Sequence, residues 1–315
     1  MKKTIDFTRI DPYIEFKKGF MKFLSLEGAP CRGLGQILVM KKLTQMRSIQ
    51  FEKDFDVYVG SSWGAVLSFC LALSVPISEI EQAFEESQTY LNSRAYRLLY
   101  PFLPRMCPNK VTQPFYPFLQ NKTLGDLKKR VICHGYDYQF KQLITFDSYH
   151  PKDRDLDLYS LVQKLIFAPS VFKPKFQTTL IDASIATRSF LFFTLMQNYQ
   201  EWKNLKIDIL HIGVGQKKQE GAKVRKLFEK GWLHWVLSKQ IFEELESIGR
   251  SYQESLCKQI LESQLYKELS VVTMSPLIES DLDFSFMGDV SLTPEKIRKE
   301  VEGWMEEFPI DHLEF

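Results

Sequence analysis

The stretch FDVYVGSSWG, residues 55–64, decides the fold of this chain. Its first half is rich in β-forming residues and ends at Gly60, and an apolar run typical of a helix begins at Ala65, so only a sharp turn fits between them. The turn has the pattern Gly-X-Ser-X-Gly with Ser62 at its centre. A strand before this pattern and a helix after it are the context of a nucleophile elbow. A Cβ atom at Gly60 or Gly64 would obstruct so tight a turn.

The hydroxyl of Ser62 has two interpretations. In an elbow it stands at the carboxyl end of a strand and at the amino end of a helix, where the helix dipole favours developing negative charge. Alternatively, Ser61 or Ser62 is simply the N-cap of that helix. Because a single Gly-X-Ser-X-Gly pattern often occurs by chance, the motif alone leaves both interpretations open.

The composition is that of a globular protein with a substantial core. The chain has 315 residues, of which 44% are hydrophobic and 25% charged. A formal net charge of +2 does not indicate a nucleic-acid partner. The cysteines are scattered, form no C-X-X-C pair and therefore indicate reduced thiols and no structural zinc: Cys31, Cys70, Cys107, Cys133 and Cys257.

The amino-terminal residues and the hydropathy pattern predict a cytoplasmic protein. Residues 1–6 contain an aspartate and lack the apolar run of a signal peptide. No stretch of the sequence approaches the roughly 18–20 uninterrupted apolar residues of a membrane-spanning helix. We therefore expect at most a peripheral attachment to a membrane.

The elements around the elbow predict an α/β fold. Residues 20–26 have the pattern of a buried strand, residues 37–46 that of a helix, and residues 55–59 that of the strand before the elbow. A βαβα start implies a parallel sheet with right-handed crossovers. Further strands are expected at residues 130–137, 142–146, 178–181 and 206–212, and helices at residues 77–92, 156–167 and 294–304.

The domain organisation is expected to be simple, because the sequence contains no internal repeat and no low-complexity linker. We predict an N-terminal leader over residues 1–19 and a single domain over residues 20–315. Within that domain, residues 216–315 are expected to form a mostly helical cap. The segment from Lys223 to Trp235 is basic and then rich in tryptophan. Such a segment either lies on an anionic membrane surface or is a core-packed helix with a solvated basic start.

The glycine-containing loop after the first strand resembles two nucleotide-binding patterns but completes neither. Gly28 and Gly33 have the spacing of a P-loop, yet Leu34-Gly35 stands where Lys-Ser/Thr is needed. The Gly-X-Gly of residues 33–35 lacks its third glycine because Leu38 fills that position. We therefore predict no nucleotide cofactor. The loop is either an oxyanion hole made of backbone N–H groups or a tight connection between strand and helix.

Asp182 is a candidate for a second catalytic group. It follows the short apolar run at residues 178–181 and therefore stands at a predicted strand end. An aspartate in this position either forms a simple Asx turn or presents its carboxylate on the same sheet edge as Ser62. His134, in contrast, lies inside a predicted strand and is interpreted as a packed residue.

Four segments in a fixed order resemble the patatin-like phospholipase family. They are LSLEGAPCRG at residues 24–33, FDVYVGSSWGA at residues 55–65, IDAS at residues 181–184 and ILHIGVG at residues 209–215. The resemblance covers about residues 20 to 305, and the order of the motifs is more specific than any one of them. It implies a three-layer α/β/α fold with a mainly parallel central sheet and a helical C-terminal cap.

The resemblance also implies roles for individual residues. Ser62 would be the nucleophile and Asp182 its base, in a Ser-Asp dyad that cleaves the fatty-acid esters of membrane phospholipids through an acyl-enzyme. No metal or other cofactor is implied, and no activator is identified. The loop that would form the oxyanion hole contains Gly28, Ala29, Cys31, Arg32 and Gly33.

Departures from the family pattern keep alternatives open. Ala29 and Pro30 replace two glycines of the family loop, and proline has no N–H to donate. Because losing one oxyanion donor lowers turnover by roughly 10²–10³-fold, one alternative is a catalytically silent lipid-binding or scaffold protein of the same fold. Another is an effector or defence lipase gated by a ligand or partner. A third is a Ser-Asp-His triad whose histidine is His211, His234 or His312.

Overall fold

The structure is a computed structural model, and it describes residues 19–29, 31–91, 107–168, 172, 179–185, 189–217, 265–278 and 293–307, together with parts of 248–263. In chain order the strands are β1 (Phe20–Leu26), β2 (Val57–Ser61), β3 (Arg130–Asp137), β4 (Gln142–Asp147), β5 (Leu180–Asp182), β6 (Lys206–Ile212), β7 (Gln216–Lys217), β8 (Glu268–Met274) and β9 (Leu277–Ile278). The helices are α1 (Gly33–Arg47), α2 (Trp63–Ala72), α3 (Ile77–Leu91), α5 (Pro108–Thr112), α6 (Tyr116–Leu119), α7 (Leu158–Leu165), α8 (Leu191–Gln197), α9 (Tyr199–Trp202) and α14 (Pro294–Glu307).

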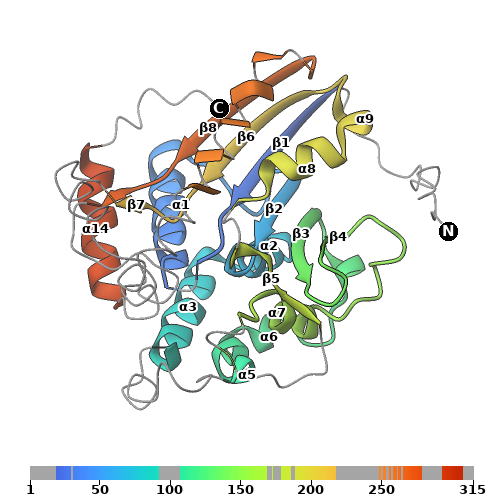
Figure 1. Cartoon of the computed structure of the whole chain (residues 1–315). Helices are drawn as coiled ribbons and strands as arrows, with labels where there is room; N and C mark the ends of the chain where they lie inside the picture. The colour runs from blue at the N-terminus through green and yellow to red at the C-terminus, as the bar shows by residue number, and fades with distance from the viewer. Residues whose placement is uncertain are drawn as a thin grey trace, which may run out of the picture.

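The central sheet has the strand order β4-β3-β2-β1-β6-β8 (Figure 1). β1 pairs in parallel with both β2 and β6, and the β2–β3 and β6–β8 pairs are parallel as well. β4 and β5 run antiparallel to β3. The predicted mainly parallel sheet is therefore confirmed, and the parallel strands end at one common edge.

Helices cover both faces of this sheet and make the fold a three-layer α/β/α sandwich. Successive residues of a strand point to opposite faces, so Leu24 joins the core under α1, α2 and α14, whereas Phe23 joins the core under α8 and α9. On the second face the rings of Phe23 and Trp202 meet edge to face, with centroids 4.9 Å apart. The predicted fold class is confirmed. Among the described residues, no helix is both long enough and apolar enough to cross a bilayer.

The C-terminal region departs from the expected helical cap at β8, which sequence analysis missed. β8 forms an edge of the central sheet, parallel to β6. Its residues alternate between half-buried and exposed along most of the strand, so it lacks the continuous apolar run by which buried parallel strands are recognised. The helix predicted at residues 294–304 is confirmed as α14, which packs on α1. Residues 218–247 and 279–292 lie outside the described part of the chain.

His134 is a packed strand residue, as predicted. Its side chain is fully buried on the α8 face of the sheet, where its ring stacks on Phe190 with centroids 4.9 Å apart. The ring of Phe193 meets it edge to face. Desolvation in this aromatic environment lowers the pKa of His134 from 6.5 to about 3. The folded protein therefore holds this imidazole neutral at a pH where the unfolded chain protonates it.

His134 should make the protein acid-sensitive. Because the pKa is lowered in the folded state, its contribution to stability is complete above pH 6.5 and is lost as the pH falls toward 3. We predict that the free energy of unfolding, measured by urea denaturation, falls by about 1.4 kcal/mol per pH unit from this group between pH 6 and pH 5. In His134→Phe this pH dependence of the free energy of unfolding should disappear. In His150→Phe, a change at an exposed histidine, it should remain. An unchanged slope in His134→Phe would contradict the assignment.

Candidate active site

The sequence around Ser62 forms a sharp strand-to-helix turn, as expected. β2 ends at Ser61, α2 begins at Trp63, and Ser62 between them has φ 51° and ψ −122°. A left-handed φ is unusual for a residue with a Cβ atom and marks local strain, which recurs at functional sites. The side chain of Ser62 makes no capping hydrogen bond to α2. Ser62 thus occupies the N-cap position of α2, but its hydroxyl does not cap the helix.

The glycines of the motif are required by close backbone approaches. A Cβ atom on Gly60 would lie 2.5 Å from the carbonyl oxygen of Gly64. A Cβ atom on Gly64 would lie 2.4 Å from the carbonyl oxygen of Leu26, at the end of β1. The elbow is thus pressed against both its own helix and the neighbouring strand, and no side chain fits at either position.

β3 sets the position of Asp182 relative to Ser62. β3 is longer than β2, and the pairing between them stops where Ser61 faces His134. Beyond that point β5 pairs with β3 instead, in the antiparallel direction, and Asp182 faces Gly135. The two segments therefore occupy consecutive positions along one strand. This arrangement brings the hydroxyl Oγ of Ser62 to 2.6 Å from Oδ2 of Asp182, a hydrogen bond between residues 120 positions apart in the sequence.

The carboxylate of Asp182 is held from both sides. The backbone N–H of Asp182 donates to the carbonyl of Phe167 at 2.8 Å. The second carboxylate oxygen, Oδ1, accepts the backbone N–H of Ser184 at 2.8 Å, in the 3-10 turn Ala183–Ile185 that follows β5. Ser62 and Asp182 are each only 1% exposed. The serine and the carboxylate therefore form a buried, oriented pair that is closed to solvent in this structure.

The loop after β1 lies directly against the elbow. A Cβ atom on Gly28 would come within 2.8 Å of both the carbonyl oxygen of Ser61 and the Cβ atom of Ser62. Ala29 and Cys31 are buried in the same loop, and α1 begins at Gly33 immediately after it. Because β1 and β2 are parallel neighbours, the amino ends of α1 and α2 lie at the same sheet edge as Ser62. This edge is suited to bind an anion.

Arg32 and Gly33, at the end of the loop, each contact a different neighbouring segment. Arg32 is buried, and its guanidinium lies 3.5 Å from the carbonyl oxygen of Gly215, so it reaches toward the segment after β6. Gly33 packs under Phe84, whose ring a Cβ atom there would meet at 2.6 Å. Pro30, on which the number of N–H donors depends, lies outside the described residues. The oxyanion role of the loop stays a prediction.

A buried polar network lies behind the loop and was not anticipated from the sequence. Oε2 of Glu27 accepts the backbone N–H of Val214 at 2.9 Å, and Nε2 of Gln36 donates to the carbonyls of Glu27 and Ile212 at 3.2 and 2.7 Å. These contacts tie the end of β1 to the end of β6. A polar residue directly after a buried strand was the only sequence signal for this role.

His211, one of the three histidines considered for a catalytic triad, belongs to this buried polar network. Its Nδ1 atom lies 2.9 Å from the hydroxyl of Ser25, and its Nε2 atom lies 3.5 Å from Oε1 of Glu27. His211 therefore contacts Ser25 and Glu27 behind the loop, whereas Asp182 contacts Ser62 directly. The other two histidines considered for a triad, His234 and His312, lie outside the described residues, as does the expected membrane segment from Lys223 to Trp235.

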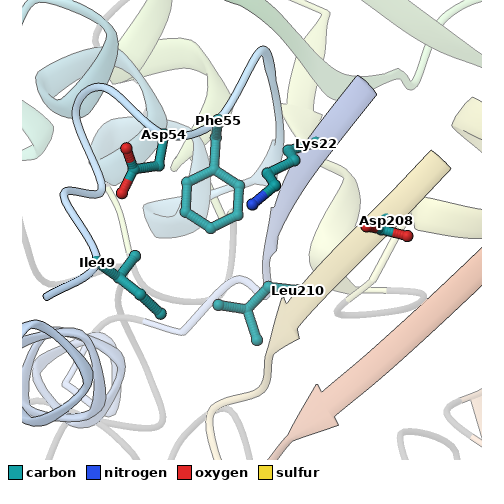
Figure 2. A pocket seen from close by; sticks show the side chains of 6 residues that line it. All are labelled: Lys22, Ile49, Asp54, Phe55, Asp208 and Leu210. Carbon is teal, nitrogen blue, oxygen red and sulfur yellow. The ribbon is translucent and has the colours of Figure 1, made fainter. Parts of the chain in front are cut away.

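A separate small cavity lies at the opposite edge of the sheet (Figure 2). It is lined by Lys22, Ile49, Asp54, Phe55, Asp208 and Leu210 and holds about 40 Å³. Lys22 and Asp208 pair across β1 and β6 well before these strands end, and Asp54 and Phe55 precede β2. The cavity is thus remote from Ser62. Within the described part of the chain, no group of three or more His, Cys, Asp or Glu side chains is placed to hold a metal ion.

The family follows from a comparison with known proteins. A model of the patatin-like phospholipase family matches residues 24–203, which is more than half of the chain. The chain belongs to this family. The matched region runs from β1 to α9 and contains the loop after β1, the elbow and Asp182.

Three individual proteins that resemble this chain share less than 30% of their residues with it. A cGAMP-activated phospholipase of Pseudomonas aeruginosa (strain BWHPSA011 / Pa011) is 28% identical over 138 residues, which are 42% of this chain and 41% of that protein. The structure of VipD from Legionella pneumophila has a TM-score of 0.45 at 11% identity, covering 90% of this chain and 67% of VipD. The type III effector ExoU of Pseudomonas aeruginosa has a TM-score of 0.36 at 14% identity, covering 90% of this chain and 52% of ExoU.

The close approach at Gly64 predicts that an added methyl group disrupts the site. Gly64→Ala forces the backbone of α2 away from Leu26, so we expect the free energy of unfolding to fall by about 3 kcal/mol. Gly303→Ala is the matched control, because a Cβ atom there meets nothing within 4 Å. Alanine in the helix at that position should stabilise the protein by about 0.5–1 kcal/mol. Urea denaturation of both variants checks this, and equal stability of the two would contradict the packing described.

The Glu27 network predicts that an acceptor, rather than a charge, is needed behind the loop. Glu27→Ala leaves the buried N–H of Val214 without its partner, which should lower the free energy of unfolding by about 1–3 kcal/mol. Glu27→Gln retains an acceptor oxygen and should recover most of this loss. Thermal and urea unfolding of the two variants measure it. If glutamine is as harmful as alanine, the contact between Glu27 and His211 is more important than the hydrogen bond to Val214.

Proposed function

We propose that this protein is a serine lipid acyl hydrolase, similar to a phospholipase A or lysophospholipase, that uses a Ser62-Asp182 dyad. The 2.6 Å hydrogen bond from the hydroxyl of Ser62 to the carboxylate of Asp182 is the observation that carries the proposal. A serine hydroxyl is a weak nucleophile until a neighbouring base removes its proton. The carboxylate of Asp182 is in position to do so, and the contacts to Ser184 and Phe167 fix its orientation.

The reaction would proceed through an acyl-enzyme. As Oγ of Ser62 attacks the ester carbonyl carbon, its proton passes to Asp182, and the carbonyl oxygen becomes an oxyanion. Backbone N–H groups of the loop at Gly28, Ala29 and Cys31, together with the amino end of α2, would stabilise this charge. The tetrahedral intermediate expels the alcohol of the lysolipid, which takes the proton from Asp182. A water molecule, deprotonated by Asp182, then hydrolyses the acyl-enzyme and releases the fatty acid.

The substrate class we propose is membrane phospholipid, and the burial of the dyad favours a gated enzyme. With Ser62 and Asp182 each 1% exposed, an ester reaches the nucleophile only after the site opens. The name of the Pseudomonas relative states that it is activated by cGAMP. We therefore propose that this chain is an effector or defence lipase whose activity depends on a small-molecule or protein activator. The competing function is a catalytically silent scaffold, and labelling of Ser62 by a fluorophosphonate separates the two.

A fluorophosphonate probe tests the dyad. We predict that the probe labels the wild-type protein at Ser62 once an activator such as cyclic GMP-AMP opens the site, with the adduct located by mass spectrometry, and that Ser62→Ala abolishes the label. Asp182→Asn keeps an oxygen for the N–H of Ser184 but removes the base, so turnover of phospholipid vesicles should fall by about 10²–10⁴-fold while the unfolding temperature stays close to that of the wild type.

Two outcomes would contradict the proposal. Absence of both labelling and fatty-acid release from phosphatidylglycerol vesicles, with and without cyclic GMP-AMP, would favour the silent scaffold. Loss of labelling in His211→Asn, combined with full labelling in Asp182→Asn, would favour a histidine base. The binding of His211 to Ser25 and Glu27 leads us to expect only a change in stability for that variant.

A further inference from the structure

The turn between β3 and β4 projects beyond the sheet edge that bears the candidate site. β2 ends opposite His134, and β3 continues to Asp137 before the chain turns back into β4. Asp182 faces Gly135, on the final stretch of the same strand. The tip of this turn, residues 138–141, therefore continues in the direction of the carboxyl ends of the parallel strands, past Ser62 and Asp182.

Two aromatic rings stand in solvent on this tip. Tyr138 is 60% exposed and Phe140 is 66% exposed. Most phenylalanines among the described residues are buried, including Phe23, Phe84 and Phe115. An exposed pair of large rings on a loop is a feature of surfaces that bind another apolar phase.

The backbone of the tip is well ordered by hydrogen bonds. Oδ1 of Asp137 accepts the N–H groups of Gln139 and Phe140 at 2.9 and 3.1 Å. The N–H of Tyr138 donates to the carbonyl of Thr179 at 2.8 Å, which ties the tip to the segment entering β5. The rings are therefore held outward by a defined turn, so binding through them costs little ordering of the backbone.

The tip also carries a positive charge, on Lys141. The ammonium group of Lys141 lies 3.3 Å from the centroid of the Tyr138 ring. Lys141 has φ 54°, a left-handed conformation that closes the turn before β4. Tyrosine and lysine both combine an apolar body with a polar end, and such side chains favour the boundary between headgroups and acyl chains. The tip thus combines an apolar group with a positive charge.

We propose that residues 138–141 dock this protein on a lipid bilayer, with Phe140 and Tyr138 inserted between the headgroups and Lys141 against anionic lipid. The proposal rests on the proposed function, because the same sheet edge would then face the membrane that supplies the ester. Docking on this edge shortens the path of a lipid from the bilayer to Ser62.

The size of the tip favours a lipid surface over a protein partner. A stable protein interface needs roughly 800 Å² from each partner, far more than two rings and one lysine provide. Membrane attachment, in contrast, gains from each inserted ring and from each cation near anionic lipid. The partner that fits this small projecting tip is therefore a bilayer.

Vesicle flotation with the Ser62→Ala protein tests docking without lipid turnover. We expect binding to vesicles of phosphatidylcholine with phosphatidylglycerol to fall about tenfold for Phe140→Ser and further for Tyr138→Ser with Phe140→Ser. Lys141→Asn tolerates the left-handed φ and should weaken binding about fivefold only when anionic lipid is present. Tyr252→Ser is the matched control, because Tyr252 is 61% exposed in the chain before β8. It should bind as the parent does.

The outcomes separate docking from catalysis. Equal binding of the parent and the double variant, or an equal loss in Tyr252→Ser, would overturn the docking proposal. So would a concentration-dependent dimer, seen by gel filtration, that the double variant abolishes without any vesicle binding. With Ser62 restored, the double variant should hydrolyse a soluble short-chain ester at the parental rate and vesicles more slowly. Tip-dependent binding by a wild-type protein that hydrolyses neither substrate, with and without cyclic GMP-AMP, would reject the proposed function and leave docking intact.

Discussion

The buried hydrogen bond between Ser62 and Asp182 is the interaction around which the neighbouring segments are arranged. It joins the end of β2 to the end of β5 at 2.6 Å, and both side chains are removed from solvent. A buried carboxylate is costly unless its oxygens are hydrogen-bonded. One oxygen of Asp182 accepts from Ser62, and the other accepts from the backbone of Ser184. These two hydrogen bonds therefore lower the free-energy cost of burying the carboxylate.

The strained backbone of Ser62 is also maintained by the segments packed around it. A residue with φ 51° persists in a fold only where its surroundings leave it no alternative. Here Gly60 and Gly64 close the turn against the neighbouring backbone, and Gly28 packs closely against Ser62 from the adjacent loop. Behind that loop, Glu27 and Gln36 link β1 to β6. The elbow is thus the innermost part of a rigid frame that extends over three parallel strands.

Much of the fold was predictable because its signals are local. The runs of β1, β2 and β6 are apolar, and the turn at residues 60–64 has a steric requirement that only glycine meets. β8 was missed because an edge strand with half-exposed side chains has no such run. The position of Asp182 at a predicted strand end left its pairing with Ser62 open, and the family resemblance favoured that pairing over an Asx turn. The contact between Glu27 and Val214 joins residues 187 positions apart, and it becomes visible only when β1 and β6 lie side by side.

The unequal lengths of β2 and β3 have a consequence for how this fold tolerates change. Ser61 of β2 pairs with His134 of β3, and Asp182 of β5 pairs with the next residue of β3, Gly135. Because side chains alternate between the two faces of a sheet, a single-residue insertion or deletion in the last part of β3 or in β5 turns the carboxylate to the opposite face. A change of chain length outside residues 134–137 and 180–182, in contrast, leaves this register unchanged. The spacing between Ser62 and Asp182 is set by the strand register on β3, whatever the length of chain that separates them.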